Sequence, residues 1–163
     1  MKKSNFSKFV KKFIDENISV ANIGSGNEKV NIYHRIDTPT LQEKWSVIDI
    51  EKSNGLSIED AMKRIKAPSL LYMRFFVHCI EDNVFQDILN WATKWIAIEV
   101  RSNKNSTEYK TYNHKRYYRS STELLKRILD SKFEIMYFIE SQGLAVFKKE
   151  NPTIIRIIAK KYE

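Results

Sequence analysis

The stretch VANIGSGN (residues 20–27) places two of the chain's four glycines in a G-x-G spacing, directly after a short apolar run. That run, ISVAN (residues 18–22), predicts a buried strand that ends at Gly24. Glycine at the end of a strand lets the backbone approach a ligand closely and leaves N–H groups available to a carboxylate or phosphate. A G-x-G pair also occurs in tight turns that bind nothing, so the stretch alone leaves both interpretations open.

The composition fits a folded protein rather than a disordered one, because 42% of the 163 residues are apolar and 29% are charged. The length suits a single domain over residues 1–163. The net charge of +8 would attract phosphates, nucleic acid or an anionic membrane surface. Acidic residues are interspersed with the basic ones, however, so nucleic-acid binding is the less favoured function.

Cysteine and histidine are too few for several kinds of site. Cys79 is the sole cysteine of the sequence, so no internal disulfide can form, and the three histidines are scattered, so we expect no metal site. No apolar run approaches the roughly 20 residues that a membrane span requires. The N-terminal segment has no long apolar core after its lysines. We therefore expect a cytoplasmic protein without a transmembrane segment.

Apolar periodicity predicts strands and helices that mostly alternate, with a strand-rich end. Strand patterns lie at 18–22, 30–37, 45–50, 95–101, 133–139, 144–147 and 153–159, and within 69–80, where a loop holding Arg74 to His78 follows a strand of about six residues. Helix patterns lie at 6–14, 57–65, 81–95 and 124–129, with capping-box candidates Ser57/Asp60 and Ser120/Glu123. Such alternation implies an α/β fold, with a mostly parallel sheet, helices on both faces and an antiparallel C-terminal edge.

The N-terminal helix pattern has its apolar residues at i, i+3, i+4, i+7 and i+8: Phe6, Phe9, Val10, Phe13 and Ile14. Lysines lie mostly off this stripe, so the helix could rest on an anionic membrane surface. Because the segment is short, a surface helix docked on the protein's own core is the favoured interpretation, and peripheral membrane contact is the alternative.

In an open parallel sheet, ligands bind beyond the carboxyl ends of the strands. The polar residues and glycines at the expected strand ends are Gly24, Gly26, Asp37, Asp49, Glu51, Arg74, His78, Glu99 and Arg101. Asp37 could accept hydrogen bonds from ribose hydroxyls, and Arg74 could hold a phosphate or carboxylate. The alternatives are a solvated charge for Arg74 and a packed or surface histidine for His78.

The segment YNHKRYYR (residues 112–119) interleaves basic and aromatic side chains and is expected to be an exposed loop. Such side chains can grip phosphate and stack on sugars or bases. His114, Arg116 and Tyr117 are therefore candidate substrate-binding residues, and a plain exposed basic loop is the alternative. Neither a nucleophile–base pair nor a Walker loop is present in the sequence.

Three segments give the chain a resemblance to class I S-adenosylmethionine-dependent methyltransferases: FSKFVKKFI (6–14), NIGSGN (22–27) and the terminal strands. The later half, roughly residues 70 to 161, is similar to methyltransferase-like domains found with bacterial surface-polysaccharide biosynthesis proteins. The segments that carry this second likeness are YMRFFVHCIEDNVFQDILNWA (72–92), IAIEVRS (96–102) and the segment from His114 to Lys161.

The resemblance implies a Rossmann-like fold that binds S-adenosylmethionine. The cofactor-binding residues would be Asn22, Gly24, Gly26, Asp37 and Asp49, with Asp37 at the ribose and Asp49 near the adenine. Arg74, His114, Arg116 and Tyr117 would bind the acceptor, and His78 would be the catalytic base.

Two departures from the family pattern concern the cofactor turn. Asn22 stands where the family often has an acid, and the ten residues between Gly26 and Asp37 are too few for a helix and a strand. The first function implied is methyl transfer to a sugar or sugar-phosphate acceptor of surface-polysaccharide synthesis, alongside a partner protein of that synthesis. The second is a degenerate, non-catalytic binding or assembly module, and the third is a small nucleic-acid-binding protein.

Overall fold

The computed structural model describes residues 5–16, 18–24, 58–64, 66–105, 116–146 and 149–163. Several predicted features lie outside these residues: the strands at 30–37 and 45–50, the helix cap at Ser57, and the candidate site residues Gly26, Asp37, Asp49, Glu51 and His114.

Five strands form one sheet with the spatial order β1-β2-β3-β5-β4. They are β1 (Val20–Ile23), β2 (Leu70–Arg74), β3 (Trp95–Arg101), β4 (Phe133–Ser141) and β5 (Ile154–Lys161). β1, β2 and β3 pair in parallel, whereas β5 pairs antiparallel with both β3 and β4. β4 therefore runs in the same direction as β1, β2 and β3, and of the described strands only β5 runs the other way.

This arrangement corrects the predicted sheet in one respect and confirms it in another. Two of the four pairings among the described strands are antiparallel, so the sheet is parallel only in part. The predicted antiparallel C-terminal edge is confirmed, because β5 and β4 lie at one side of the sheet and β5 pairs antiparallel with both of its neighbours. Apolar patterning marks which residues form strands, but it does not determine which strands become neighbours.

The other predicted elements are mostly confirmed, with one exception. The 144–147 strand is wrong over its described part, because residues 144–146 form bends and an irregular segment after Gly143, whose φ is +81°. Arg74 also moves, from the predicted loop to the last position of β2. The capping box at the start of α5 (Ser121–Asp130) is confirmed, because Ser120 Oγ accepts a hydrogen bond of 3.1 Å from the Glu123 N–H.

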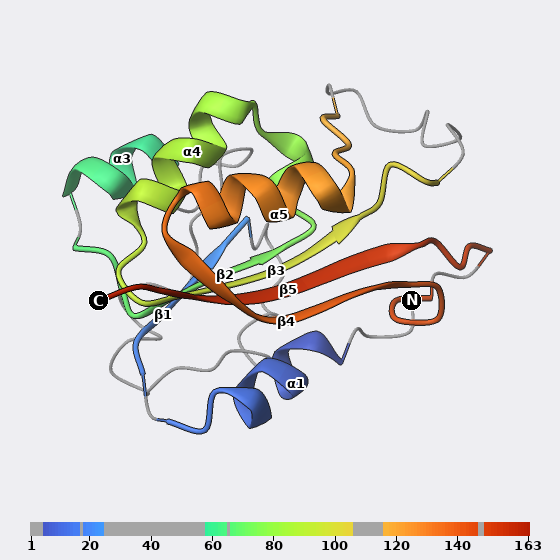
Figure 1. Cartoon of the computed structure of the whole chain (residues 1–163), viewed down its shortest axis with the longest axis horizontal. Coiled ribbons are helices and arrows are strands. Elements are labelled where there is room, and N and C mark those ends of the chain that lie inside the picture. Colours follow the sequence, from blue (N-terminus) through green and yellow to red (C-terminus); the bar gives the residue numbers. More distant parts are fainter. Residues whose placement is uncertain (1–4, 17, 25–57, 65, 106–115, 147–148) are drawn as a thin grey trace.

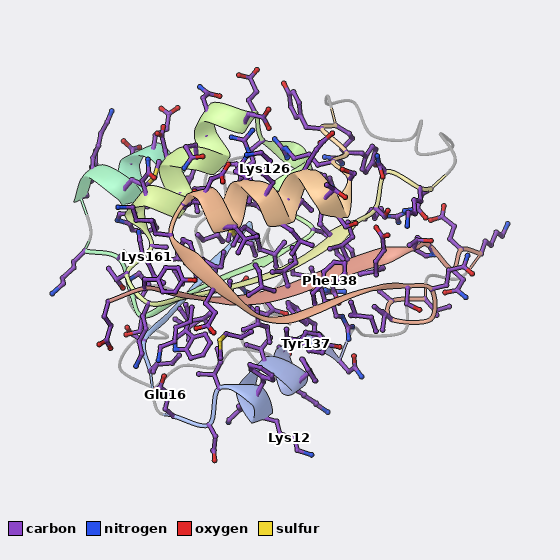
Figure 2. All side chains as sticks on the ribbon, viewed as in Figure 1. Lys12, Glu16, Lys126, Tyr137, Phe138 and Lys161 are labelled. Atoms are coloured by element: carbon purple, nitrogen blue, oxygen red, sulfur yellow. The ribbon has the colours of Figure 1, made fainter. Side chains whose placement is uncertain are left out.

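Helices cover both faces of the sheet (Figure 1). α3 (Ile58–Arg64), α4 (Asp82–Trp91) and α5 lie on one face, and α1 (Phe6–Phe13) lies on the other. The stripe predicted for α1 packs on the protein, because Phe6 and Val10 are fully buried against the sheet. Tyr137 of β4 lies against Phe9 of α1 with ring centroids 4.6 Å apart, as its position in Figure 2 shows. Within the described residues, no helix is both long and apolar enough to span a bilayer.

The sheet has two ends that matter for function. β1, β2, β3 and β4 all finish at one end, which we call the carboxyl edge, and all begin at the other, which we call the amino edge. The sequence predicts ligand binding at the carboxyl edge, where Gly24 and Arg74 lie.

Arg119 fastens the carboxyl-edge loops together, although the sequence suggested an exposed basic loop there. Its side chain is buried and donates to four groups: Asp82 Oδ1 at 2.8 Å and the carbonyls of Val77, Ile80 and Tyr117 at 2.8, 2.7 and 3.3 Å. The guanidinium beside Asp82 lowers the pKa of that carboxyl. Arg119 thus joins the start of α5 to the start of α4 and to the loop after β2.

We predict that Arg119→Ala lowers the free energy of unfolding by about 2–3 kcal/mol, because it leaves buried carbonyl groups without a donor. Urea unfolding followed by circular dichroism measures the change. Lys126→Ala is the matched control: Lys126 is a 73% exposed cation paired with Asp130, and its loss should cost less than about 0.5 kcal/mol. Equal effects of the two substitutions would contradict the role assigned to Arg119.

Candidate functional site

The turn after β1 requires glycine for two separate reasons. Gly24 has φ +73°, a left-handed conformation that side chains disfavour. A Cβ atom at this position would also lie 2.4 Å from Cδ2 of Phe76, which packs directly on the Gly24 backbone. The Phe76 ring therefore braces this turn from the loop that follows β2.

The chain turns sharply after β2, at Phe75. Phe75 has φ +53°, which is uncommon for a bulky residue and costs free energy. Its N–H donates a 2.7 Å hydrogen bond to the Glu99 carbonyl of β3, which holds the strained backbone in place. Strain of this kind clusters at functional sites. Here the strained turn at Phe75 directs the chain so that Phe76, two residues after β2 ends at Arg74, contacts Gly24.

Arg74 and Gly24 stand at the same level of the sheet. Ile23 of β1 pairs with Met73 of β2. Gly24 directly follows Ile23, and Arg74 directly follows Met73, on adjacent parallel strands. Asn22 lies two residues before Gly24, pairs with Tyr72 and is 4% exposed. The structure therefore brings the predicted cofactor turn and the predicted acceptor arginine to one place at the carboxyl edge.

A buried carboxylate fixes Arg74. Glu99 is fully buried, and its Oε1 accepts a 3.0 Å hydrogen bond from Arg74 Nε. Its other oxygen, Oε2, accepts a 2.7 Å bond from Arg156 Nε on β5. The Arg156 side chain is 5% exposed. One carboxylate thus joins guanidinium groups from the strands on both sides of β3.

The second arginine of this cluster is fully committed to the fold. Arg156 Nη2 donates at 3.0 Å both to Asn5 Oδ1, before α1, and to the Leu144 carbonyl. Its guanidinium also lies over the Phe6 ring, 5.2 Å from the centroid. Arg156 therefore ties β5 to α1 and cannot turn toward a ligand without losing these contacts.

Arg74 differs from Arg156 because its terminal nitrogens remain available. Its side chain is 18% exposed, and among the described residues its Nη1 and Nη2 atoms have no hydrogen-bond partner. Burial, followed by the charge of Glu99, raises the pKa of the neighbouring Tyr72 far above its usual value, so that phenol stays neutral. Two guanidinium groups and one carboxylate leave the cluster with a net positive charge, which suits an anion.

His78 lies in the short 3-10 helix η2 (Val77–Cys79), close to the residues predicted from the basic loop. It is 6% exposed, with its ring 5.5 Å from that of Tyr118. Its carbonyl accepts a 2.7 Å hydrogen bond from the Tyr117 N–H, and Arg116 Nη1 lies 2.8 Å from Cys79 Sγ. The structure therefore joins His78, Arg116 and Tyr117 into one group beside the end of β2.

The segment around Tyr117 is less exposed than the sequence suggested. Arg116 and Tyr117 are half-buried. The Tyr117 hydroxyl donates a 3.0 Å hydrogen bond to Glu81. Burial, and then this bond to the carboxylate, raises the pKa of Tyr117. The Tyr117 hydroxyl is thus engaged with the loop before α4.

Sequence reasoning missed the residues that support this site. Phe75 and Phe76 appeared as part of an apolar run, Arg156 as a strand residue, and Arg119 as an exposed cation. Glu99 was noted as the end of a strand but not as a partner of Arg74. The sequence did contain a signal for this pairing: Glu99 is an acid inside a mostly apolar strand, and a buried acid requires a cation nearby.

Among the residues that the structure describes, no group of three or more His, Cys, Asp or Glu side chains converges as a metal site would. The described cofactor candidates are Asn22 and Gly24, and they fit a nucleotide-type cofactor in one respect: a left-handed glycine turn sits at the carboxyl end of the first strand.

Comparisons with known proteins bear on the fold. No protein-family model matches the sequence, and the curated protein sequences contain no match to it. Solved structures do match. The 1,6-didemethyltoxoflavin-N1-methyltransferase of Burkholderia thailandensis, solved with S-adenosylhomocysteine, aligns over 96% of this chain and 76% of its own, with 11% identity and a TM-score of 0.60.

Two further methyltransferase structures align over nearly the whole of their own length and nearly the whole of this chain. One, from Methanosarcina mazei, aligns over 94% of this chain and 96% of its own, with 12% identity and a TM-score of 0.58. The other, from Mesorhizobium loti, aligns over 89% and 91%, with 10% identity and a TM-score of 0.56. At this identity the likeness concerns architecture. The chain has the fold of class I S-adenosylmethionine-dependent methyltransferases.

Proposed function

We propose that this protein transfers a methyl group from S-adenosylmethionine to a small acceptor that carries an anionic group. The observation that carries the proposal is the juxtaposition of Gly24 and Arg74 at the carboxyl edge, where Glu99 holds Arg74 by Nε and no other described residue bonds its terminal nitrogens. The fold supports the cofactor, because structures that align with this chain were solved with S-adenosylmethionine or S-adenosylhomocysteine bound.

The chain's own residues would divide the work as follows. Asn22, Gly24 and Gly26 would hold the methionine part of the cofactor, Asp37 its ribose and Asp49 its adenine. When bound, S-adenosylmethionine supplies an electrophilic methyl group on a sulfonium. Methyl transfer depends mainly on alignment of the acceptor with that group.

Arg74 would provide the alignment by binding the acceptor's anion through its terminal nitrogens, with His114, Arg116 and Tyr117 as further acceptor-binding residues. His78 would accept the proton that the acceptor atom loses. A sugar phosphate or an acidic sugar of surface-polysaccharide synthesis is the acceptor class we propose, with a partner protein of that synthesis supplying or receiving the sugar.

The second candidate is a binding or assembly module that has lost the cofactor. Its supporting observation is the turn itself: Asn22 offers an amide where an acid is common, and Phe76 fills the space beside Gly24. A titration with S-adenosylmethionine separates the two functions. Micromolar binding supports the enzyme, and absence of binding at millimolar cofactor supports the module.

We predict that Gly24→Ala weakens S-adenosylmethionine binding at least tenfold by calorimetry, because the new Cβ displaces Phe76 and reshapes the turn. Gly143→Ala is the matched control. Gly143 also has a positive φ, +81°, but a Cβ added there would have no atom within 4 Å, so the substitution should cost only about 1 kcal/mol of stability, from the strained backbone. The control should leave cofactor affinity unchanged. Unchanged affinity in Gly24→Ala would remove this turn from the cofactor site.

We predict that Arg74→Met raises the KM for an anionic acceptor about tenfold or more, the value of one charge-assisted bidentate contact, while cofactor affinity stays the same. The measurement is transfer of a labelled methyl group to matched sugar phosphates and neutral sugars. Arg74→Lys keeps the charge but loses the planar fork, so it should recover only part of the effect. Equal use of neutral and anionic sugars by the native protein would contradict the assignment.

For His78 the expected result is a kcat effect. His78→Gln should lower kcat by roughly a hundredfold, the usual contribution of a general base. Activity that survives unchanged in both His78→Gln and His78→Ala would exclude His78 as the base.

A further inference from the structure

A hollow of about 690 Å³ opens at the amino edge of the sheet, at the opposite end from Gly24 and Arg74. It is formed where three strands begin and one ends. The lining residues are Ser19 before β1, residues 66–69 before β2, residues 93–94 before β3, and residues 160–163 at and just after the end of β5. We call this feature the amino-edge hollow. Neither the proposed cofactor site nor the proposed acceptor site uses any of these residues.

Lysines dominate the charge of the amino-edge hollow. Its lining contains four of them, Lys66, Lys94, Lys160 and Lys161, against a single acid, Glu163. Like charges gathered around one recess repel one another, and a bound anion relieves that repulsion. The net charge of +8, which the methyltransferase site does not explain, is partly concentrated here.

Two of the four lysines have structural partners. Lys161 Nζ donates to the carbonyls of Leu89, Asn90 and Ala92 at 3.1, 3.2 and 2.7 Å, and so closes the C-terminal end of α4. Lys94 pairs with Glu16 at 3.1 Å. Figure 2 shows Lys161 and Glu16 at the same end of the molecule, where β5 finishes.

The other two lysines are available to a ligand. Neither the Lys66 nor the Lys160 ammonium has a hydrogen-bond or ion-pair partner among the described residues, although the charge of Lys160 also acts on Glu16. Lys160 Nζ lies 5.5 Å from the centre of the Trp95 ring. A hydroxyl adds a third donor. Ser19 Oγ donates to Ser69 Oγ at 3.3 Å, which leaves the Ser69 proton free to donate outward.

We propose that the amino-edge hollow binds a small phosphate-bearing molecule through Lys66, Lys160 and Ser69. Phosphate oxygens accept charge-assisted hydrogen bonds from ammonium and hydroxyl groups of this kind. Tyr162, at 61% exposure, lines the same recess and offers an aromatic face to a ring attached to the phosphate. A recessed site of this volume fits one small ligand, whereas a nucleic-acid backbone needs a continuous basic track. The proposal is independent of the methyltransferase function.

The test is a titration of the full chain with inorganic pyrophosphate, followed by calorimetry or by backbone NMR. The expected result is saturable binding that weakens as salt rises. Lys66→Gln and Lys160→Gln should each weaken binding roughly five- to tenfold. Lys66 is exposed, so its substitution keeps the test valid if the Lys160 variant loses stability.

One control, a second ligand and one further variant complete the test. Lys126→Gln removes an exposed cation on α5, away from the hollow (Figure 2), and should leave the affinity unchanged. ADP should bind more tightly than pyrophosphate, and Tyr162→Ala should remove that advantage.

Three outcomes would overturn the proposal: no binding of pyrophosphate, equal losses in Lys66→Gln and Lys126→Gln, or an oligonucleotide that binds tighter than ADP through the same lysines. The last would assign the surface to nucleic acid instead. Because the variants leave Gly24 and Arg74 untouched, S-adenosylmethionine binding reports separately on the proposed function.

Discussion

The buried carboxylate of Glu99 is the group on which the carboxyl edge depends. It lies in the middle strand of three and pairs with a cation from each neighbour, Arg74 on β2 and Arg156 on β5. A charge buried in this way is tolerated only when it is paired and hydrogen-bonded, and removing it would leave two guanidinium groups facing each other. The same oxygens that stabilise the sheet therefore decide where the candidate ligand-binding arginine stands. Stability and binding share one residue at this point.

Local sequence patterns predicted the individual elements well. The 3.6-residue apolar stripe of α1 packs on the sheet, and the serine before α5 caps it as its spacing indicated. Both features depend on residues within one or two turns of each other, so they can be seen in a short stretch of sequence. The insertion of β5 between β3 and β4 could not be seen in that way. Arg156 and Glu99 are 57 residues apart, and their pairing follows from topology rather than from any local pattern.

The candidate site was likewise predicted only as far as local sequence patterns allow. The rule that ligands bind where parallel strands end singled out Gly24, Arg74 and His78 from the sequence, and the structure brings the first two to one level of the sheet and places His78 in the loop that follows. What the rule could not supply is the support: Phe76 packed on Gly24, the strained Phe75 and the buried Arg119. These residues look apolar or exposed when taken singly. Their roles arise from contacts between loops that only the folded chain creates. The functional roles assigned to the site residues all remain predictions: Asn22, Gly24, Gly26, Asp37, Asp49, Arg74, His78, His114, Arg116 and Tyr117.

The position of β5 has a consequence for how the protein forms. β5 is synthesised after every other described strand, yet it sits inside the sheet and supplies the strand pairing that joins β3 to the edge strand β4. Until β5 emerges, β4 has no strand to pair with and Glu99 lacks its second counter-ion. The earlier elements can gather on the ribosome, but the carboxyl edge closes in a late step that joins residues far apart in the chain. Without β5, the facing edges of β3 and β4 have no strand between them, and unpaired strand edges of this kind favour association with other chains.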